Sequence, residues 1–541
     1  MENITARISI KTIILTLIII CLLRSEEFRD ITYFKALNKF NNQVAAKNII
    51  QNGHLYTSHE IIDVEKQYMQ HGLSFLSTKW QIPTDETVDK YIDDYQETAK
   101  ANNGRALSDV QLAGVKGVLQ SDKFITCLQG DAGAGKTTAL KAANQWFKSQ
   151  GIEVIGLAMQ GVAAKTLADD SGAKSFTLAS YLGQKETKGD GKQKVILFDE
   201  AGMLDSRNAL ALFEKAAKNG DKVVLIGDIN QLGAISAGKP FERLVEHAEK
   251  QGTLIRFNEN YRQKDPELRQ AVDLIKQGKA DECLEIIDKA KNGGIIELED
   301  KNLRRAVIAD KYDNNTLVLC NTKAARIDLN EQIREKLFRN GTLKESEQAD
   351  FVMADKDEDG LQVERPTKLC IGEKIIFTQN EYKTYDIMND ERAEIMAIES
   401  KMLTVKTGDN RELKIDTETY PYIDYGYAMT TFKPQRQTYN KVVIDADTSI
   451  SSLNDMRNAY VQITRCRENI KIYTDDKDYF KELAKERRIE KDTMDIITAT
   501  SKQAAKEIYQ AKEEKLQEQA KQTESDTKTI VEKDFDNTIR N

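Results

Sequence analysis

Residues 130 to 140 read GDAGAGKTTAL, a stretch whose residue types and spacing suit the binding of a nucleotide's phosphates. Gly130 is followed, after four residues, by Gly135, Lys136 and Thr137. Glycines let backbone N–H groups close round phosphate oxygens, the lysine supplies positive charge, and the threonine hydroxyl can ligate Mg²⁺. An apolar run before the loop (FITCLQ) and a helix-spaced run after it (TTALKAANQWF) supply the strand and the helix that this chemistry requires. The loop predicts a nucleotide site, but it does not distinguish kinases, GTPases, transporters and motors.

Two adjacent carboxylates follow a hydrophobic strand further along the chain, in VILFDEAGMLDS. Asp199 is placed to hold Mg²⁺ through water, and Glu200 to take the proton from an attacking water, so the pair divides metal and base roles. Together with the phosphate loop, the pair favours ATP hydrolysis with Mg²⁺ over a module that only binds nucleotide.

Polar and cationic residues come later in the chain, and Gln231, Arg465 and Arg467 among them follow strand-like runs. The full set is Gln231, three residues after Asp228 in LIGDINQLGAISAG, Tyr261 and Arg262 in NENYRQ, and Arg465 and Arg467 in AYVQITRCRENIKIYT. Each arginine could instead be a surface ion-pair partner. A γ-phosphate held between two α/β lobes needs cations from the second lobe. These arginines come after the phosphate loop and the carboxylate pair in the chain, where a second lobe is expected.

The elements that must position these residues alternate between strand and helix from Leu107 onward. Short β-branched runs occur at 154–159, 194–200, 222–228 and 316–321 and are separated by helical stretches, which predicts parallel sheets covered by helices. Between Cys370 and Tyr425 the strand candidates KIIFTQN, AEIMAIES, MLTVKT and RELKID predict a small β-barrel or sheet set into the second α/β unit. Residues 25–104 are expected to be helical, and residues 481–541, rich in Lys, Glu and Gln, to be a charged helix fraying into a disordered tail.

Composition sets broader limits. The chain has 541 residues, of which 40% are hydrophobic, enough for about three or four domains with real cores. The net charge of −8 argues against a generally basic protein that coats nucleic acid, but it leaves room for a basic channel. The six cysteines form no CxxC pair, which is typical of reduced thiols in a cytosolic protein without a zinc site.

Residues 1–24 form an apolar leader. Arg7 and Lys11 precede a charge-free run from Thr12 to Leu23 that is too short to cross a bilayer comfortably. A signal peptide would match the basic start and the apolar run, but no small-residue cleavage site follows. Because an ATP-driven site needs cytosolic nucleotide, we expect a cytoplasmic protein, with membrane association through the leader as an open alternative.

The order of the motifs resembles that of superfamily 1 DNA helicases of the RecD-like branch, most closely the helicase part of conjugative relaxase-helicases of the TraA/TraI type. The matching segments are LSDVQLAGV, GDAGAGKTT, VIGLAMQGVAAKTL, SFTLASYL, DEAGML, GDINQL, NYRQ, GYAMTTFKPQ and YVQITRCR, with YTSHEIIDVEKQYMQHG before them. The resemblance covers roughly residues 50–480. It implies two RecA-like P-loop lobes, at 105–256 and 257–480, with the β insertion at about 370–425 in the second lobe.

The resemblance also implies roles for single residues. Gln111 would read adenine, and Tyr261 would lie against its ring. Phosphate and Mg²⁺ would be held by the loop Gly130, Asp131, Ala132, Gly133, Ala134, Gly135, Lys136, Thr137 and Thr138, with Thr137 and Asp199 as the metal ligands. Glu200 would activate water, while Gln231, Arg262 and Arg465 would sense and stabilise the γ-phosphate; Arg467 could equally be a structural partner.

Candidates for contact with DNA come from the segments that match the family's DNA-binding motifs. They are Thr177, Ser180, Asn321, Thr322, Thr430 and Lys433. Hydroxyl and amide groups suit phosphate contact, but each of these side chains is just as plausible as a helix cap or turn former.

Three departures from the family's pattern qualify the match. Where the family has T-x-H-K-S-Q-G, this chain has TTFKPQR, with Phe432, Pro434 and Arg436 in place of histidine, serine and glycine, so coupling of hydrolysis to DNA is expected to be weakened. The link at 184–193 is shorter than the strand-separating hairpin of related helicases. No His-x-His pair precedes the motor, so DNA nicking is not expected.

The leading hypothesis is an ATP-dependent DNA helicase or translocase that moves 5′ to 3′ on single-stranded DNA. By resemblance its setting is conjugative transfer, with conjugation machinery proteins as partners, or a repair-like role. A degenerate DNA-binding ATPase that no longer unwinds is the first alternative, and a nonenzymatic remnant that contacts a membrane or partner is the second.

Overall fold

The computed structural model describes residues 49–52, 55–76, 80–103, 106–131, 133–184, 193–234, 238–356, 361–431 and 439–486. The chain divides into two compact units, Met1–Val64 with Lys491–Asn541 and Glu65–Glu490. The expected leader and almost all of the expected tail lie outside the described residues.

In the first unit, the described residues form an antiparallel hairpin of β1 (Ile49–Asn52) and β2 (Leu55–Ser58), followed by the start of α3 (His59–Gly72). The expectation of helix throughout 25–104 is therefore wrong at this hairpin. In the sequence IIQNGHLYTS the β-branched and aromatic residues of the two runs favour strand over helix, and a glycine follows the first run.

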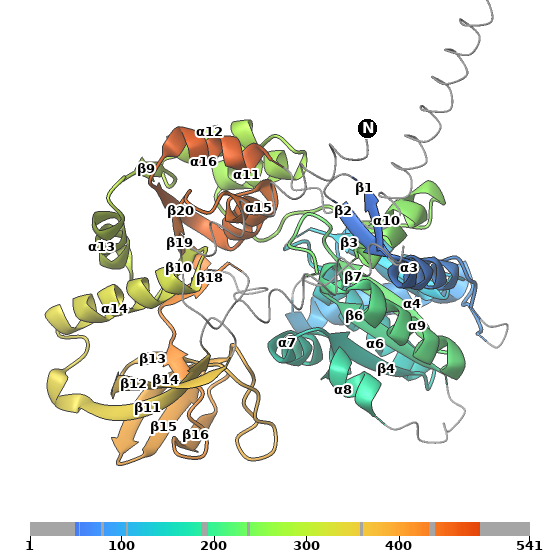
Figure 1. Ribbon diagram of the computed structural model, residues 1–541. Helices are drawn as coiled ribbons and strands as arrows, with labels where there is room; N and C mark the ends of the chain where they lie inside the picture. Colours follow the sequence, from blue (N-terminus) through green and yellow to red (C-terminus); the bar gives the residue numbers. More distant parts are fainter. Residues whose placement is uncertain are drawn as a thin grey trace, which may run out of the picture. The chain divides into compact units, whose positions relative to one another are not determined.

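The second unit contains a six-stranded sheet in which every neighbouring pair is parallel. Its order is β5 (Lys174–Thr177), β4 (Glu153–Ala158), β6 (Lys194–Asp199), β7 (Lys222–Gly227), β3 (Ile125–Gly130) and β8 (Ile255–Phe257). Its helices are α4 (Asp85–Asn103), α5 (Asp109–Gln120), α6 (Lys136–Ser149), α7 (Gly161–Ser171), α8 (Leu178–Gly183), α9 (Ser206–Asn219) and α10 (Pro240–Lys250). The alternating strands and helices predicted from the sequence are confirmed here (Figure 1).

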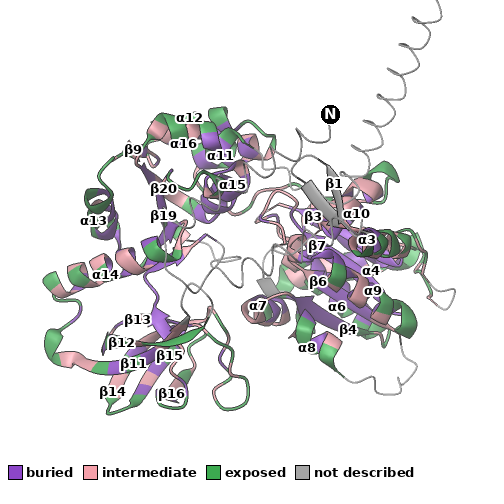
Figure 2. Ribbon diagram, viewed as in Figure 1, coloured by how far each residue is buried: buried purple, intermediate pink, exposed green. Residues whose placement is uncertain are grey.

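Both faces of this sheet are covered, because successive residues of each buried strand point to opposite sides. Ile196 and Phe198 of β6 pack in one core with α8, α9 and α10, and Val195 and Leu197 pack in another with α4, α5 and α6. Figure 2 shows the central strands as buried ribbons between more exposed helices. This two-sided burial explains why the strands read as continuous apolar runs in the sequence.

A second parallel sheet of five strands follows, in the order β18 (Ala428–Thr430), β10 (Thr316–Cys320), β19 (Tyr439–Ala446), β20 (Cys466–Thr474) and β9 (Ile295–Glu297). One face packs against α11 (Pro266–Lys276), α12 (Ala280–Lys289), α15 (Met456–Thr464) and α16 (Lys477–Lys485). The other packs against α13 (Lys301–Lys311) and α14 (Lys323–Arg339). We call the parts built on the six-stranded and five-stranded sheets lobe 1 and lobe 2.

Antiparallel strands are inserted between β10 and β18. A five-stranded sheet has the order β16 (Glu412–Asp416), β15 (Met402–Thr407), β14 (Arg392–Glu399), β13 (Lys374–Phe377) and β17 (Ile423–Tyr425). The four strands predicted from the sequence in this stretch are confirmed. The antiparallel structure begins earlier than expected, however, with a hairpin of β11 (Gln348–Lys356) and β12 (Gln362–Cys370). The charged, mixed composition of these two strands concealed them in the sequence.

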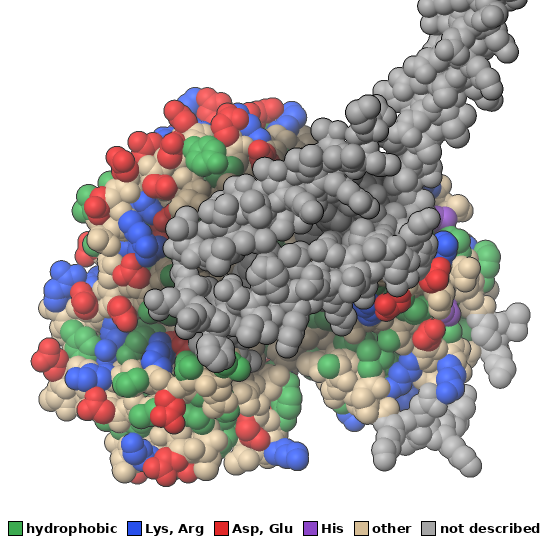
Figure 3. Space-filling view, viewed as in Figure 1, with side chains coloured by type: hydrophobic (Ala, Val, Ile, Leu, Met, Phe, Trp, Pro, Cys, Tyr) green, Lys and Arg blue, Asp and Glu red, His purple; other side chains and the backbone are tan. Residues whose placement is uncertain are grey.

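Among the helices that the structure describes, none is both long enough and apolar enough to span a bilayer. On the side drawn in Figure 3, acidic and basic side chains are interspersed over the described surface.

Candidate active site

The phosphate loop lies where the sequence predicts it, between the end of β3 at Gly130 and the start of α6 at Lys136. Gly133 and Gly135 have φ values of 83° and 74°, in the left-handed region that favours glycine. A Cβ atom added to Gly133 would lie 2.3 Å from Cβ of Arg262. Backbone geometry and close packing therefore both require glycine at this position. Ala132 lies outside the described residues.

Lys136 turns its ammonium group back onto the loop. Its Nζ donates to the carbonyl oxygen of Gly130 and, at 3.2 Å, to that of Asp131. Burial lowers the pKa of Lys136, while the nearby carboxylates of Asp228 and Glu200 act in the opposite direction. The lysine is thus a poorly solvated cation held by neutral carbonyl groups, a setting in which phosphate oxygens would be better partners.

The two carboxylates after β6 have an unusual backbone geometry. Glu200 has φ 54° and ψ 43°, a left-handed conformation that is uncommon for a residue with a side chain. Its N–H donates to Oδ1 of Asp199 at 2.7 Å. Such strain is retained where the surrounding structure enforces it and is frequent at active sites. Here it accompanies two adjacent carboxyl groups that line the same cavity.

A cavity of about 160 Å³ brings the predicted residues together. Its lining consists of Gly133, Ala134, Gly135, Lys136, Thr137, Leu140, Thr166, Asp170, Asp199, Glu200, Gln231, Arg262 and Arg465. Lobe 1 supplies the phosphate loop and the carboxylates, and Arg465 comes from the end of α15 in lobe 2. Residues more than 300 positions apart in the sequence, as 136 and 465 are, therefore share one site. The strand-like interpretation of the run before Arg465 is wrong, because AYVQIT belongs to a helix that is buried on all sides, which removes the polar spacing typical of a surface helix.

Arg465 is the most deeply buried cation of this cavity, with 1% of its surface exposed. Its Nη2 lies 3.5 Å from Oε1 of Gln231, and its Nε has no hydrogen-bond partner. Burial lowers the pKa of Arg465, and burial followed by the charge of Arg465 lowers that of Arg262 to about 10. Two guanidinium groups with so few partners fit an anion, and a nucleotide's γ-phosphate carries the charge and oxygen atoms that they lack.

Thr137 and Asp199 are the residues that the sequence predicts as ligands of Mg²⁺. A hydroxyl and a carboxylate are the hard oxygen ligands that Mg²⁺ accepts, with phosphate oxygens and water completing its shell. Both residues line the cavity beside Lys136. The donor set therefore fits a magnesium–nucleotide complex.

The two residues predicted to contact adenine lie next to the loop but already have partners. Gln111 accepts from the N–H of Ser108 at 3.0 Å in a capping box at the start of α5, and it donates to the carbonyl of Gly135 at 3.2 Å. Tyr261 donates its N–H to the carbonyl of Gly133 at 3.1 Å, and 52% of its surface is exposed. An exposed ring beside the loop is compatible with stacking, and reading of adenine by Gln111 stays a prediction.

The sequence did not predict that the carboxylate of Asp228 accepts several hydrogen bonds. Tyr460 of α15 donates its hydroxyl to Oδ2 of Asp228 at 2.6 Å, and Gln129 and Gln231 donate to the same carboxylate, each at 3.3 Å. This buried group therefore joins strands β3 and β7 of lobe 1 to a helix of lobe 2. The tyrosine stands inside the YVQITRCR segment, so its place in that motif was the available signal.

The NYRQ segment makes a second connection to α15. Arg262 donates to the carbonyl of Thr464 at 3.2 Å, and buried Gln263 donates to the carbonyls of Thr464 and Cys466 at 3.3 and 2.9 Å. The carbonyl oxygens on either side of Arg465 are thereby fixed. Arg467, in contrast, is exposed and is not among the residues that line the cavity.

A third missed connection is an ion pair between the phosphate loop and lobe 2. Asp131 lies 2.9 Å from Nζ of Lys276 on α11. Nothing in the sequence pattern marked this lysine, because it occupies an ordinary position near the end of an amphipathic helix.

The candidate DNA residues mostly have local structural roles. Thr177 caps α8 by accepting from the N–H of Ser180 at 3.2 Å, and Thr322 caps α14 by accepting from the N–H of Ala325 at 3.0 Å. Thr430 ends β18 beside Cys320 of β10. Capping does not prevent a threonine from touching a phosphate, so the DNA assignments stay predictions.

The remaining predictions in this group lie partly outside the described structure. Asn321 belongs to a polar network in lobe 2 with Asn454 and Gln462. Lys433 falls within 432–438, beyond the described residues, as do the departures at Phe432, Pro434 and Arg436 and most of the link at 184–193.

Comparison with known proteins finds a matching family model and several relatives. Residues 106–301 match a family model described as an AAA domain. The chain is 30% identical over 389 residues to the probable conjugal transfer protein TraA of Sinorhizobium fredii, an alignment that covers 70% of this chain and 33% of that protein. It is 25% identical over 392 residues to the ATP-dependent RecD2 DNA helicase of Deinococcus radiodurans, covering 70% of this chain and 50% of the relative.

A Bacteroides Pif1 structure bound to single-stranded DNA superposes with a TM-score of 0.47 and 18% identity, covering 70% of this chain and 94% of the Pif1 chain. The chain spans about a third of the length of the TraA relative that it matches.

Proposed function

For a chain that carries an AAA domain and is related to TraA conjugation proteins and to RecD-like superfamily 1 helicases, we propose an ATP-driven motor on single-stranded DNA. The motor hydrolyses ATP in the cavity between the lobes and moves 5′ to 3′ along the strand. The observation that carries this proposal is the joint lining of one cavity by a phosphate loop, a strand-end carboxylate pair and Arg465 of the other lobe.

The residues of the cavity divide the work of hydrolysis. Phosphate oxygens would replace the loop carbonyls as partners of Lys136, and the N–H groups of the loop would hold them. Thr137 and Asp199 would hold Mg²⁺, which would supply positive charge at the phosphates. Glu200 accepts the proton of the attacking water, and Arg465 with Arg262 stabilises the charge that develops on the transferred group.

Hydrolysis can move the lobes because Arg465 belongs to lobe 2 while the phosphate loop belongs to lobe 1. With the γ-phosphate present, the two buried arginines gain the anionic partner that they otherwise lack. When the phosphate leaves, that attraction between lobes is lost. Tyr460 on Asp228, and Arg262 and Gln263 on the carbonyls around Arg465, transmit the change to α15. Closure on ATP and opening after hydrolysis would advance the protein along a strand.

The setting that we propose is conjugative DNA transfer, because the relatives include conjugal transfer proteins. Contact with conjugation machinery, contact with a membrane and a cytoplasmic location stay predictions. A degenerate ATPase that binds DNA without unwinding it is the second candidate, favoured by the TTFKPQR sequence in place of the family's T-x-H-K-S-Q-G.

Steady-state phosphate release with and without oligo(dT), followed by strand separation on duplexes with a 5′ or a 3′ tail, tests the proposal. We expect turnover that rises with single-stranded DNA and unwinding of the 5′-tailed duplex. Lys136→Ala should abolish turnover while the protein stays folded, since it removes the cation that faces the phosphates. Turnover with stimulation but no unwinding would support the degenerate ATPase, and an unaltered rate in folded Lys136→Ala would refute the assignment of the site.

A further inference from the structure

A buried amide on α15 connects the arginine of the nucleotide site to the strand ends of lobe 2. Gln462 has 2% of its surface exposed and lies between apolar neighbours, Val461 and Ile463, on a helix that is buried from Arg457 to Thr464. A buried amide without hydrogen bonds would be destabilising, and an apolar side chain would fill this space at less cost. The hydrogen-bond partners of Gln462 therefore show what its buried amide does.

Both N–H groups of this amide are engaged, and their acceptors come from different strands. Nε2 of Gln462 donates to Oδ1 of Asn321 at 2.9 Å and to Oγ1 of Thr431 at 2.8 Å. Asn321 directly follows β10, and Thr431 directly follows β18. These strands are parallel neighbours, so the two acceptors lie at the carboxyl edge of the sheet, where open α/β sheets bind their ligands.

The same residue is joined to Arg465 through the backbone. The N–H of Arg465 donates to the carbonyl of Gln462 at 3.3 Å, across the last turn of α15. The guanidinium of Arg465 lines the nucleotide cavity, whereas the side chain of Gln462 holds the strand-end segments. A displacement of Arg465 toward or away from a γ-phosphate therefore moves the anchor of both segments.

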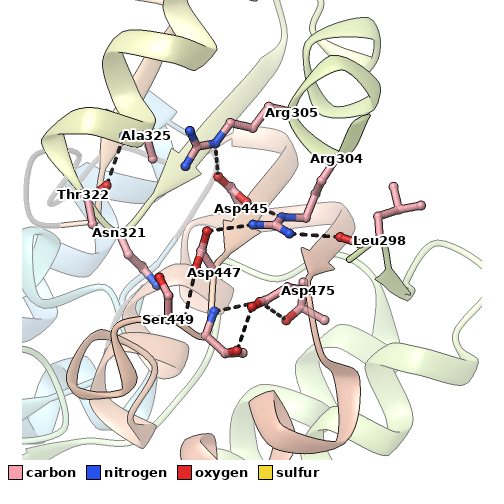
Figure 4. A network of polar contacts seen from close by, with 12 residues as sticks. Leu298, Arg304, Arg305, Asn321, Thr322, Ala325, Asp445, Asp447, Ser449 and Asp475 are labelled. Atoms are coloured by element: carbon pink, nitrogen blue, oxygen red, sulfur yellow. Dashed lines mark hydrogen bonds and ion pairs between the residues drawn. The ribbon is translucent and has the colours of Figure 1, made fainter. Parts of the chain in front are cut away.

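The far side of this network is held by further hydrogen bonds and ion pairs. Asn321 donates to Oδ1 of Asn454 at 2.8 Å, and Asn454 donates to the carbonyl of Asp447 at 2.8 Å. Arg304, with 1% of its surface exposed, is held between Asp445 at 2.9 Å and Asp447 at 2.8 Å. Figure 4 shows this arginine between its carboxylates, with Asn321 at the neighbouring strand end. Asn454 directly precedes the N-cap of α15, whereas Gln462 lies near the end of this helix, three residues before Arg465. A change at Arg465 therefore reaches the strand ends through Gln462.

We propose that Gln462 is a positioning residue that couples the nucleotide state of Arg465 to the affinity of lobe 2 for single-stranded DNA. The proposal rests on the proposed function and adds a specific route for the coupling. Through Asn321 and Thr431, Gln462 sets the position of the segments Asn321–Thr322 and Thr430–Thr431 relative to α15. Loss of its amide should uncouple the two ligands without removing either binding site.

Coupling is measured as the ratio of the Kd values for fluorescent oligo(dT) with and without a nonhydrolysable ATP analogue, by anisotropy. For the natural protein we expect a ratio of about fivefold or more, the lower end of the usual range for allosteric coupling. Gln462→Met, which keeps the volume and removes the amide, should bring the ratio to within about twofold of one. The nucleotide-free Kd for oligo(dT) and the DNA-free rate of phosphate release should stay within about twofold of the natural values.

Two further variants separate coupling from stability. Thr431→Val removes one acceptor without changing the side-chain shape, and it should reduce the ratio as Gln462→Met does, with no further loss when the two are combined. Asn144→Leu is the matched control, because it removes another buried amide bond, to the carbonyl of Ser171 at 2.7 Å in lobe 1, and should leave the ratio unchanged.

The outcomes distinguish this inference from the proposed function. If natural protein couples the ligands and folded Gln462→Met and Thr431→Val couple them equally well, the role of Gln462 is refuted and the motor stands. An equal loss of coupling in Asn144→Leu would also overturn it, because the effect would then be one of general stability. If the natural protein binds nucleotide and DNA with no mutual effect, both the motor and the coupling residue are refuted.

Discussion

Replacement of Arg465 by methionine tests whether this residue acts in the hydrolysis of ATP rather than in its binding. Methionine fills a similar volume without the charge. Because Arg465 is the buried cation that lobe 2 brings to the cavity, we expect kcat for ATP hydrolysis to fall by about 10²- to 10³-fold, the range for loss of a group that stabilises transition-state charge. The Kd for ATP should change far less, since the phosphate loop and Lys136 remain.

Arg465→Met should lower kcat without lowering the free energy of unfolding. Burial and the charge of Arg465 lower the pKa of Arg262 to about 10, which corresponds to a cost on the order of 3 kcal/mol for keeping Arg262 charged in the fold. Arg465 is itself buried with an unpartnered Nε. Removing its charge relieves part of both penalties, so the free energy of unfolding of Arg465→Met should be unchanged or raised by about 1 kcal/mol.

Phosphate release under saturating ATP measures the first effect, and urea unfolding followed by circular dichroism measures the second. Arg467→Met is the matched control, because this side chain is exposed two residues further on and should leave kcat within about twofold. A fall in kcat of less than about threefold would contradict the role of Arg465 in catalysis. A parallel loss of stability would show that the arginine is a structural partner instead.

Three other changes have defined outcomes. Glu200→Gln should bind ATP with nearly unchanged affinity but hydrolyse it at least about 100-fold more slowly, since the amide cannot accept a proton; loss of binding in a nucleotide titration would make Glu200 structural. Burial raises the pKa of Asp221 from 3.8 to about 6, so the stability associated with its neutral form is present below pH 3.8 and lost as pH rises through 6. Asp221→Asn should therefore raise the free energy of unfolding by on the order of 1–3 kcal/mol at pH 7.5 and by less at pH 4.5, and an equal effect at both pH values would contradict this reasoning. Phe432→His, Pro434→Ser and Arg436→Gly together should increase the stimulation of ATP turnover by DNA, because glycine permits backbone geometry that arginine resists. If the natural protein already unwinds DNA efficiently and the triple change leaves unwinding unaltered, the hypothesis that this segment has lost its coupling function is wrong.

Short-range signals in the sequence predicted much of lobe 1 and of the phosphate site. The GDAGAGKTT spacing, the apolar runs before each strand end and the helical spacing after them are local features, and the structure places each where expected. Gln231, Arg262 and Arg465, which the resemblance places at the γ-phosphate, line one cavity, and their roles in hydrolysis stay predictions. The carboxyl ends of the parallel strands β3, β6 and β7 place the phosphate loop, the carboxylates and Gln231 at one edge of the lobe 1 sheet. Arg465 reaches the cavity from lobe 2, at the end of α15, which local spacing does not reveal and only the resemblance implied.

The parts that sequence reasoning missed depend on tertiary contacts or on weak local patterns. Lys276 pairs with Asp131, and Tyr460 with Asp228, across long stretches of chain, so no local spacing could reveal them. The hairpin β11–β12 is rich in charged residues on its exposed face and lacks a clear apolar alternation. Thr177 and Thr322 were proposed for DNA by resemblance, and the structure gives both a capping role that a sequence motif cannot distinguish from ligand contact.

Displacement of streptavidin from biotin at one end of single-stranded DNA measures the central claim most directly, because it reports ATP-driven movement without requiring unwinding. We predict ATP-dependent displacement from the 3′ end, slower or absent displacement from the 5′ end, and none from either end with Glu200→Gln. Phosphate release that continues while streptavidin stays bound at both ends, or displacement from the 5′ end alone, would contradict a motor that moves 5′ to 3′.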